Sequence, residues 1–309
     1  MTTHLNPMPA DEPSGMSRRR FVASLGLIGA AAWMVPRWLS AQDGGVVAMA
    51  RNEAATSAIT VQTLRGNISV LSGSGGNIAV LPGADGTLLI DGGYAVSRQK
   101  ILAALAGLGP DPNKHLVNTH WHFDHTDGNE WLHSAGASII AHENTRRHLS
   151  TTTRVEGWDH TFPPSPAGAI PEIVFANEHV LHLNRATILL KHYGPAHTDS
   201  DISVRFMDAD VLHTGDTWWN GQFPFIDYST GGSIAAAIRA ADANIAAVGA
   251  DTLVIPGHGP VGGRSDLVAF RDMLVTIRDK VAALKKQGRT LDDVINSERR
   301  QGLERTCPP

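Results

Sequence analysis

The sequence predicts a mixed α/β protein in which a layered β-sheet core is covered by helices. Short strand-like segments fill the first third of the chain after its N-terminal segment, and helical and strand-like segments alternate after them. Strands followed by alternating helices and strands are typical of sheet layers packed under helices. The length of 309 residues also leaves room for about one large domain after the N-terminal segment.

The N-terminal segment, residues 17–42, resembles an export signal. Three arginines at residues 18–20 precede an apolar stretch at residues 22–35. About 14 helical residues rise about 21 Å, which is less than the roughly 30 Å of a membrane's hydrocarbon core. The Ser-Arg-Arg-Arg-Phe start resembles a twin-arginine signal, so we expect the twin-arginine export machinery as a partner. An uncleaved anchor and a buried N-terminal helix are the alternatives.

Cleavage of this signal sets the expected domain boundaries. The small residues Ala48 and Ala50 predict a cut after Ala50, and Ala41 is a second candidate. We therefore expect a signal peptide over residues 1–50 and a single hydrolase-sized domain over residues 51–309. The mature protein is expected in the periplasm or secreted, with no membrane span left after cleavage.

Four short strands are expected first, because β-branched runs alternate with Gly and Asn. They lie at residues 59–66, 67–73, 77–83 and 87–93. Helical spacing of apolar residues follows at 94–108. Further strands are expected at 115–120, 137–142, 178–193, 201–206, 211–214 and 251–255, and further helices at 126–136, 143–150, 233–249 and 264–287. Residues 150–171 lack periodicity and predict a long loop, and the residues after 287 read as a polar tail.

Composition and missing motifs exclude several classes of function. The net charge of −4 gives no basic field for nucleic acid. The single cysteine, Cys307, allows no internal disulfide, and it lies in the tail, where no catalytic nucleophile is expected. No Gly-x-Ser-x-Gly motif occurs, and residues 73–78 break the dinucleotide-binding pattern at its last glycine. A small-molecule substrate is therefore expected.

A histidine cluster at the end of one expected strand predicts a metal site. The stretch THWHFDH contains His120, His122, Asp124 and His125. Strand residues two apart point to the same side, so His120 and His122 can converge on one ion, while Asp124 and His125 face a second as the chain turns. Imidazole and carboxylate ligands suit zinc, and also iron or manganese. Further candidate ligands follow later strands in loops, at His197, Asp216 and His258.

These motifs, taken in order, resemble the metallo-β-lactamase-fold superfamily. They are the LLIDGG strand, the His120-x-His122-x-Asp124-His125 run, and three downstream ligands in "GPAHTD", "TGD" and "PGHGP". The resemblance implies an αββα sandwich, two mixed sheets flanked by helices, with two metal ions at one edge. It implies that His120, His122 and His197 hold one ion, that Asp124, His125 and His258 hold the other, and that Asp216 bridges them. Asp91 would fix the turn below the site.

The resemblance also implies a hydrolase with two Zn²⁺ ions, iron or manganese being possible. A metal-bridging hydroxide would attack an amide, ester or thioester carbonyl, with Asp124 and Asp216 as the catalytic residues. Asp124 would orient the hydroxide and pass a proton to the leaving group. A β-lactam or lactone is the first expectation for the substrate.

Four alternative functions remain open. An aspartate at position 216 resembles glyoxalase II, a thioesterase. Iron-dependent persulfide dioxygenases share the fold and would make the chain an oxidoreductase. A binding protein without turnover and a phosphodiesterase are the remaining two.

Aromatic residues near the expected site are candidates for substrate binding. They are Trp218, Trp219, Phe223 and Trp158. The alternative is that most of these aromatic rings belong to the hydrophobic core. The 150–171 loop is a candidate lid, with ordinary surface packing as the alternative. A substrate carboxylate would need a cationic anchor, for which Arg146, Arg147 and Arg154 are candidates.

Overall fold

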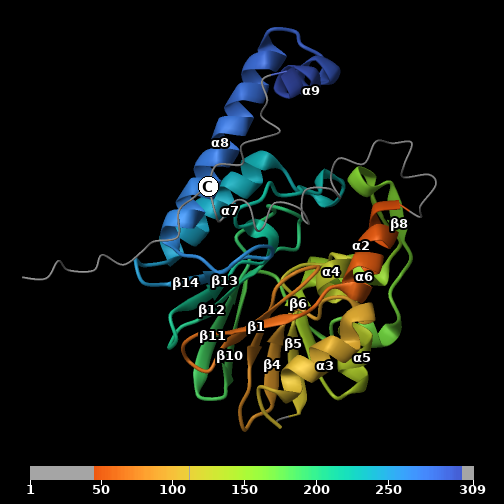
Figure 1. The fold of residues 1–309 in the computed structure, drawn as a ribbon, viewed down its shortest axis with the longest axis vertical. Helices are drawn as coiled ribbons and strands as arrows, with labels where there is room; N and C mark the ends of the chain where they lie inside the picture. Colours follow the sequence, from red (N-terminus) through yellow and green to blue (C-terminus); the bar gives the residue numbers. More distant parts are fainter. Residues whose placement is uncertain (1–44, 111, 301–309) are drawn as a thin grey trace, which may run out of the picture.

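Two β-sheets stacked face to face form the centre of the protein (Figure 1). The computed structural model describes residues 45–110 and 112–300. The predicted export signal and Cys307 lie outside the described residues. The first sheet has seven strands and the second has five.

The first sheet changes from antiparallel to parallel pairing at its middle. Its strands pair antiparallel from β1 to β4 and parallel from β4 through β5 and β6 to β9. The strands are β1 (Thr60–Thr63), β2 (Ser69–Ser72), β3 (Ile78–Leu81), β4 (Thr87–Ile90), β5 (Asn113–Val117), β6 (Ser138–His142) and β9 (Ile173–Phe175). The carboxyl ends of β4 and β5 therefore meet at one edge.

The second sheet follows the same plan. Its first four strands pair antiparallel, and β13 and β14 pair parallel. The strands are β10 (Glu178–Leu183), β11 (Ala186–Lys191), β12 (Ser203–Phe206), β13 (Val211–His213) and β14 (Leu253–Ile255). The loops after β13 and β14 therefore start from a shared edge.

Alternation along the central strands divides the apolar residues between two layers. Leu88 and Ile90 of β4 point to the core between the sheets, whereas Leu89 packs outward against Ile101 and Leu105 of α3 (Arg98–Ala106). Side chains alternate between the two faces of a strand, so a strand that is apolar on both faces must be covered by other elements on both sides. The buried strands of the first sheet therefore require the helical layer that covers them.

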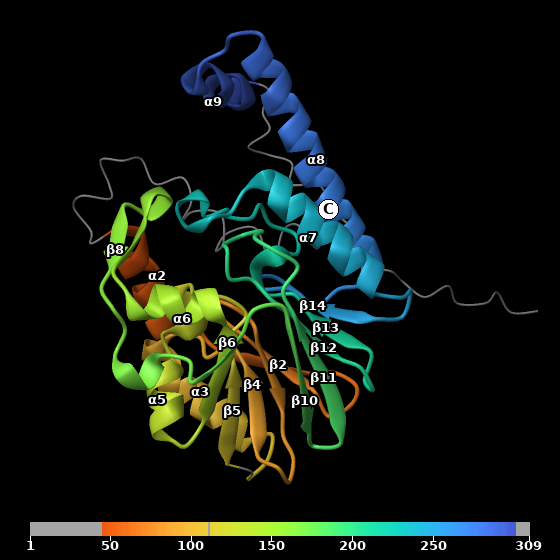
Figure 2. The ribbon, with the colours of Figure 1, turned by 180° about the vertical axis from the view of Figure 1, so that it is seen from behind.

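Helices cover the outer face of each sheet and complete an αββα sandwich (Figure 2). The outer face of the first sheet carries α3 and α5 (Asn129–Ser134). The outer face of the second carries α7 (Ile234–Ala247) and α8 (Arg264–Lys286), which pack on Leu212 and Val254. Two shorter helices, α4 (Phe123–Thr126) and α6 (Glu143–Ser150), lie between strands of the first sheet in the chain.

Two expectations about irregular segments differ from the structure. The expected 150–171 loop holds a small hairpin of β7 (Thr153–Val155) and β8 (His160–Phe162), because three-residue strands are too short to show a period. Short 3-10 turns lie at Glu156–Trp158 and Ala167–Ala169. The expected polar tail contains a helix, α9 (Leu291–Arg300). The Thr290 hydroxyl accepts from the Asp293 amide while the Asp293 carboxylate accepts from the Thr290 amide, a capping box that the sequence contained.

The N-terminal helix α2 (Gly45–Thr56) runs through the predicted cleavage position after Ala50. Val47 and Ala54 are buried against an aromatic cluster that includes Tyr94, Trp121 and Phe123. The Lys100 ammonium donates to the carbonyls of residues 54, 55 and 57 at the end of α2, at distances of 2.6 to 3.0 Å. The helix is thus part of the packed domain. Within the described residues, no helix is long and apolar enough to cross a membrane.

Candidate metal centre

One edge of the sandwich gathers the candidate ligands of the first sheet. The chain leaves β5 at Val117, bends at residues 119–121 and becomes extended at His122, then enters α4, whose first turn carries Asp124 and His125. His120 and His125 are fully buried. The end of the strand and the start of the short helix therefore present four side chains in one place.

The second sheet supplies the other three candidates at the same edge. His197 lies in the turn before β12, Asp216 in the 3-10 turn Gly215–Thr217 after β13, and His258 in the loop after β14. The His213 ring stabilises this edge, because one nitrogen accepts from the Gly215 amide at 3.1 Å and the other donates to the Asn77 carbonyl at 3.1 Å. All seven predicted ligands are thus brought together from both sheets.

The seven side chains form two groups, each with ligand atoms within 4.8 Å of one another. The first group is His120, His122, His197 and Asp216, and the second is Asp124, His125 and His258. Asp216 also touches the second group, because its Oδ1 lies 3.1 Å from His125 Nε2 and its Oδ2 lies 3.4 Å from His258 Nε2. Asp216 thus reaches ligand atoms of both groups.

The chemistry of these atoms fits metal ions. Among the candidate ligands, four buried polar atoms have no hydrogen-bond partner: His120 Nε2, His125 Nε2, His258 Nε2 and Asp216 Oδ1. Buried polar atoms are nearly always paired, so orphans gathered in one place need an explanation. A divalent cation coordinated by imidazole nitrogen and carboxylate oxygen supplies one.

Asp91 and Thr119 form hydrogen bonds to the Nδ1 atoms of His125 and His120. His125 Nδ1 donates to Asp91 Oδ2 at 2.8 Å, and Thr119 Oγ1 donates to the same oxygen at 2.7 Å. The Thr119 hydroxyl in turn accepts from His120 Nδ1 at 3.1 Å. Asp91 has a positive φ of 68°, which places its carboxylate under the ligand loop. These bonds leave the Nε2 atom of both rings directed at the candidate centre.

Asp227 is a further functional residue, which the sequence analysis missed. Its Oδ2 accepts from His122 Nε2 at 3.1 Å, and its amide donates to the His197 carbonyl at 2.9 Å. The Phe225 carbonyl accepts from His197 Nδ1 at 2.6 Å. One turn therefore orients two histidines of the first group. The only signal in the sequence was an aspartate within the aromatic run FPFIDY.

Two glycines allow the ligand side chains to pack closely. A Cβ on Gly76 would overlap the His125 ring, and a Cβ on Gly257 would overlap Asp216 Oδ1. Any other residue at these positions would displace a ligand. The backbone around the centre is therefore shaped to the ligands on both sheets.

Burial favours the neutral form of His120 and His122 in the first group. It lowers the pKa of His120 well below its usual value, and the neighbouring His125 lowers it further. Burial also lowers the pKa of His122 to about 4, although the hydrogen bond to Asp227 opposes this. Neutral imidazole is the form that binds a metal ion.

In the second group, nearby carboxylates raise the pKa of both histidines. Although burial opposes it, Asp216 and Asp124 raise the pKa of His258 to about 9, and they also raise the pKa of His125. Burial would raise the pKa of Asp216, but the surrounding histidines, His258 first, hold it well below its usual value. The cluster therefore favours positive charge at its centre, which protons or a cation can supply.

The predicted substrate-binding aromatic residues are placed differently from one another. Trp218 has no exposed surface and packs in the core under α7 and α8, so its prediction as a substrate contact is wrong. The Trp219 ring lies 4.3 Å from the His258 ring, and the Trp158 ring lies 4.7 Å from the His122 ring. Phe223 is 51% exposed. The roles of these last three in substrate binding stay predictions.

Two of the three predicted arginine anchors are engaged elsewhere. Arg147 pairs with Asp199 at 2.5 Å. Arg154 pairs with Glu156 at 2.8 Å and with Asp159 at 2.6 Å. Their charges are thus largely used within the chain.

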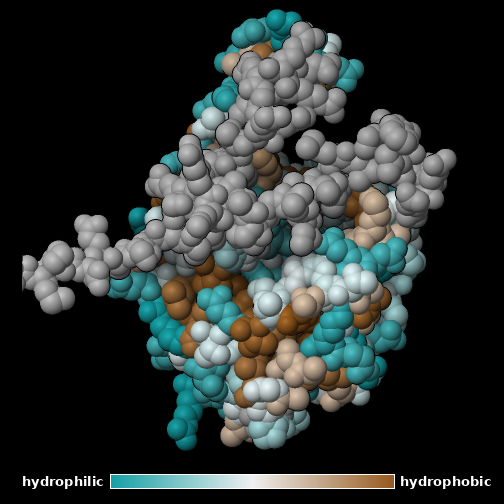
Figure 3. Space-filling view, in the orientation of Figure 1, coloured by the Kyte–Doolittle hydropathy of each residue, from teal (hydrophilic) through white to brown (hydrophobic). Residues whose placement is uncertain are grey.

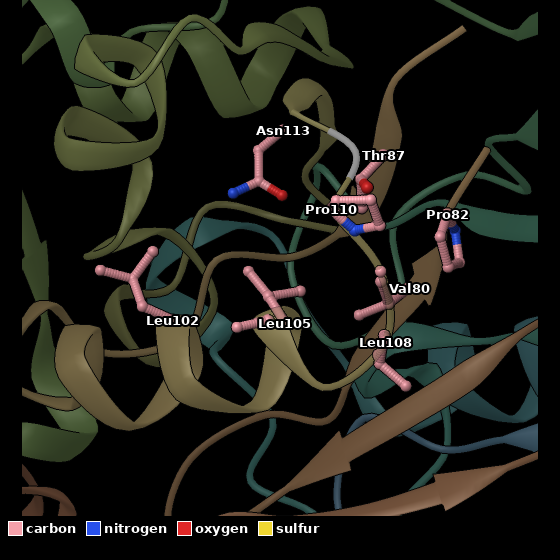
Figure 4. A pocket seen from close by; sticks show the side chains of 10 residues that line it. Val80, Pro82, Thr87, Leu102, Leu105, Leu108, Pro110 and Asn113 are labelled. Carbon is pink, nitrogen blue, oxygen red and sulfur yellow. The ribbon is translucent and has the colours of Figure 1, made fainter. Parts of the chain in front are cut away.

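A pocket of about 260 Å³ lies away from the metal centre (Figure 4). Its lining comes from α3 and from the amino ends of β4 and β5, including Leu105, Thr87 and Asn113. The ligands follow the carboxyl ends of the same strands, so the pocket lies at the opposite edge of the sheet. It takes no part in the candidate centre.

Comparison with known families agrees with this geometry. Residues 71–258 match the model of the metallo-beta-lactamase superfamily, a range that begins in β2 and ends at His258. The chain belongs to the metallo-beta-lactamase superfamily. The predicted superfamily and the predicted αββα fold are confirmed.

Individual members of the superfamily resemble the chain at moderate identity. A hydroxyacylglutathione hydrolase of Rhodospirillum rubrum is 29% identical over 161 residues, which are 52% of this chain and 53% of the relative. The chain thus spans about half the length of this curated relative. A metallo-beta-lactamase from Pontibacter korlensis has a TM-score of 0.58 at 18% identity, over 70% of this chain and 98% of that one. The DIM-1 metallo-beta-lactamase has a TM-score of 0.57 at 20% identity, over 71% and 98%.

Proposed function

We propose that this protein is a binuclear metal-dependent hydrolase that cleaves an amide, ester or thioester bond, with zinc as the preferred metal. The observation that carries the proposal is the arrangement of seven ligands in two groups that share Asp216. Each group offers three ligands besides Asp216, in the nitrogen-rich sets that zinc prefers. Membership of a superfamily of metallohydrolases supports the same conclusion.

The two aspartates of the site have different roles, metal binding for Asp216 and proton transfer for Asp124. Bound divalent ions would polarise the carbonyl of the substrate and lower the pKa of a shared water molecule. Asp216 is buried and surrounded by histidines, which suits a ligand that stays ionised. Asp124 is the more exposed carboxylate, with 12% of its side chain accessible, so it can orient the attacking water and deliver a proton to the leaving group.

A thioesterase of the glyoxalase II type is the second candidate. It is favoured by the similarity to the hydroxyacylglutathione hydrolase and by the aspartate at position 216. The mononuclear iron alternative is less consistent with the structure, because His125 lies among the ligands of a complete second group. The metal content and the thioester activity of the protein separate these candidates.

The first test measures the metal content of the purified protein together with hydrolysis of a lactone, a chromogenic β-lactam and a thioester. We expect about two zinc ions per chain and turnover of at least one compound. His122→Ala and Asp124→Asn should each lower kcat/KM at least about 100-fold, since one loses a ligand and the other the proton relay. The exposed His182→Ala is the matched control. Near-normal activity in both site variants contradicts the proposal.

We also propose that the protein is exported, to the periplasm or beyond, on the strength of its N-terminal sequence. The packing of α2 bears on where the signal is removed. A cut after Ala50 would take away Val47, which is only 2% exposed. A cut after Ala41 would leave α2 intact. Intact-mass measurement of the exported protein should give an N-terminus before Gly45, and an N-terminus at residue 51 would contradict this.

A further inference from the structure

We infer that the substrate is an uncharged ester or lactone with an apolar acyl group, and that a carboxylate on the acyl group is disfavoured. The inference rests on the proposed hydrolase function. It is drawn from the side chains at the open side of the metal centre and from the balance of charge there.

The open side of the centre lies at Asp124 and His258. Their side chains are 12% and 15% exposed, whereas those of His120 and Asp216 are 2% exposed or less. A substrate therefore reaches the centre past a carboxylate. Asp124 adds negative charge at this entrance, which offsets the positive charge that a bound metal ion would bring.

The loop after Asp216 forms one wall of this entrance. Its start lies on the second group, because the Trp219 ring packs on His258 and the Asn220 amide donates to the His258 carbonyl at 2.9 Å. Its end lies on the first group, where the Phe225 ring is 6.1 Å from the His122 ring. Between these anchors lies Phe223, which is 51% exposed. An exposed phenyl ring on a loop that joins both groups offers an apolar contact to a substrate.

The β7–β8 hairpin extends the apolar wall. Trp158 stacks on Phe225 with ring centroids 4.9 Å apart and also contacts His122. Phe162 of the same hairpin contacts Phe123 of α4 at 5.5 Å. The wall therefore continues from the loop to the hairpin. The Arg51 guanidinium lies 5.4 Å from the centre of the Phe123 ring, and its charge is paired with Asp127 at 3.0 Å.

The cations near this wall are already paired. In the described hairpin and loop, residues 153–162 and 219–228, the basic side chain is Arg154, which is bound to Glu156 and Asp159. Burial and the nearby Arg51 lower the pKa of His160, which favours its neutral form. These segments therefore offer a substrate carboxylate no free cation.

The metal ions themselves would add little net charge. Two divalent ions carry four positive charges, and the four carboxylates that are ligands or hold ligands balance them. These are Asp91, Asp124, Asp216 and Asp227. A balanced centre with apolar walls favours a neutral substrate.

The test compares two para-nitrophenyl esters with equal numbers of acyl carbons, the hexanoate and the monoester of adipate, on the zinc-loaded full-length protein. We expect kcat/KM for the hexanoate to exceed that for the adipate ester at least about 10-fold. An equal or higher value for the adipate ester overturns the inference and leaves the hydrolase intact. If neither these esters nor a lactone or thioester is hydrolysed, the proposed function fails and the inference falls with it.

A charge-adding variant tests the wall directly. Phe223→Arg should move the hexanoate-to-adipate ratio at least about fivefold toward the adipate ester, by placing a cation beside the substrate. Val281→Arg, on an exposed position of α8, is the matched control and should leave the ratio unchanged. Quenching of tryptophan fluorescence by an unreactive ketone and its keto-acid counterpart gives a binding readout that does not depend on turnover. An unchanged ratio in Phe223→Arg contradicts the placement of Phe223 at the entrance.

Discussion

Each histidine of the first group has one ring nitrogen bound by a partner outside the ligand set. Thr119 holds His120, Asp227 holds His122, and the Phe225 carbonyl holds His197. Such bonds choose the tautomer and fix the ring orientation, so the other nitrogen is presented to the metal. The strength of metal binding thus depends on residues that never touch the ion.

Asp227→Asn is expected to weaken zinc binding about 10- to 100-fold, because the negative charge behind His122 is lost. The affinity can be measured by competition with a chromophoric chelator. Asp208→Asn is the matched control, since Asp208 accepts from the Thr187 amide away from the site. An affinity within twofold of the unchanged protein would show that Asp227 is not a positioning residue.

Gly257→Ala is expected to lower both zinc content and activity, because its Cβ would overlap Asp216 Oδ1. The conservative control is Gly249→Ala, whose Cβ would make an ordinary contact with Thr252 at 3.8 Å. Metal analysis and thermal unfolding of both variants distinguish a local effect from misfolding. Full zinc occupancy in Gly257→Ala would contradict the close packing of Asp216.

Among the elements, α6 begins at a histidine that also ends β6. His142 Nδ1 accepts from the Asn144 amide at 3.2 Å, and Nε2 donates to the Ala176 carbonyl at 2.9 Å. The ring stacks on His192 with centroids 4.0 Å apart. This helix cap requires a neutral ring, since a proton on Nδ1 would remove the acceptor.

The cap makes stability depend on pH. Burial and the stacked His192 lower the pKa of His142 below 6.5, although Glu143 and Asp199 act in the opposite direction. Below about pH 6.5 the unfolded chain takes up a proton that the folded chain resists, so the free energy of unfolding falls as the pH falls. His142→Asn keeps a capping oxygen without the titration and should reduce this fall in urea unfolding between pH 7 and 5. The exposed His182→Asn should not change the pH dependence, and equal profiles for both variants would argue against the cap.

For the whole molecule, the candidate centre joins the two sheets at one edge. The first group alone combines His120 and His122, which follow β5, with Asp216, which follows β13. The apolar layer between the sheets holds the sandwich together away from this edge. The face in Figure 3 mixes hydrophilic and hydrophobic patches, as is usual for a folded domain.

Removal of the metal should therefore destabilise the whole domain. A ligand at about 1,000 times its Kd stabilises the folded state by about 4 kcal/mol. We expect a chelator to lower Tm by several degrees and added zinc to restore it, followed by differential scanning calorimetry. An unchanged Tm after verified loss of zinc would show that the two sheets do not depend on the centre.

The seven candidate ligands that the structure brings together stand in local patterns of the sequence. Four of the seven ligands lie within residues 120–125, and the other three each stand in a short turn after a strand or before one. Asp227 was missed because its contact joins residues 105 positions apart in the chain. Trp218 and Trp219 are neighbours in the sequence, yet one is in the core and the other lies on His258.

Strand and helix periodicity predicted most of the elements, and the ordered motifs, through their resemblance to the metallo-β-lactamase-fold superfamily, implied the sandwich and the seven candidate ligands. Each motif is a short stretch of sequence and can be recognised without the folded chain. The order of the strands, the turn of Asp227 under His122, the burial of Trp218 and the pairing of Arg154 came only with the folded chain. Each of these features depends on contacts between segments that are far apart in the sequence. Contacts of that kind arise from the complete packing of both sheets, and no short stretch of sequence records them.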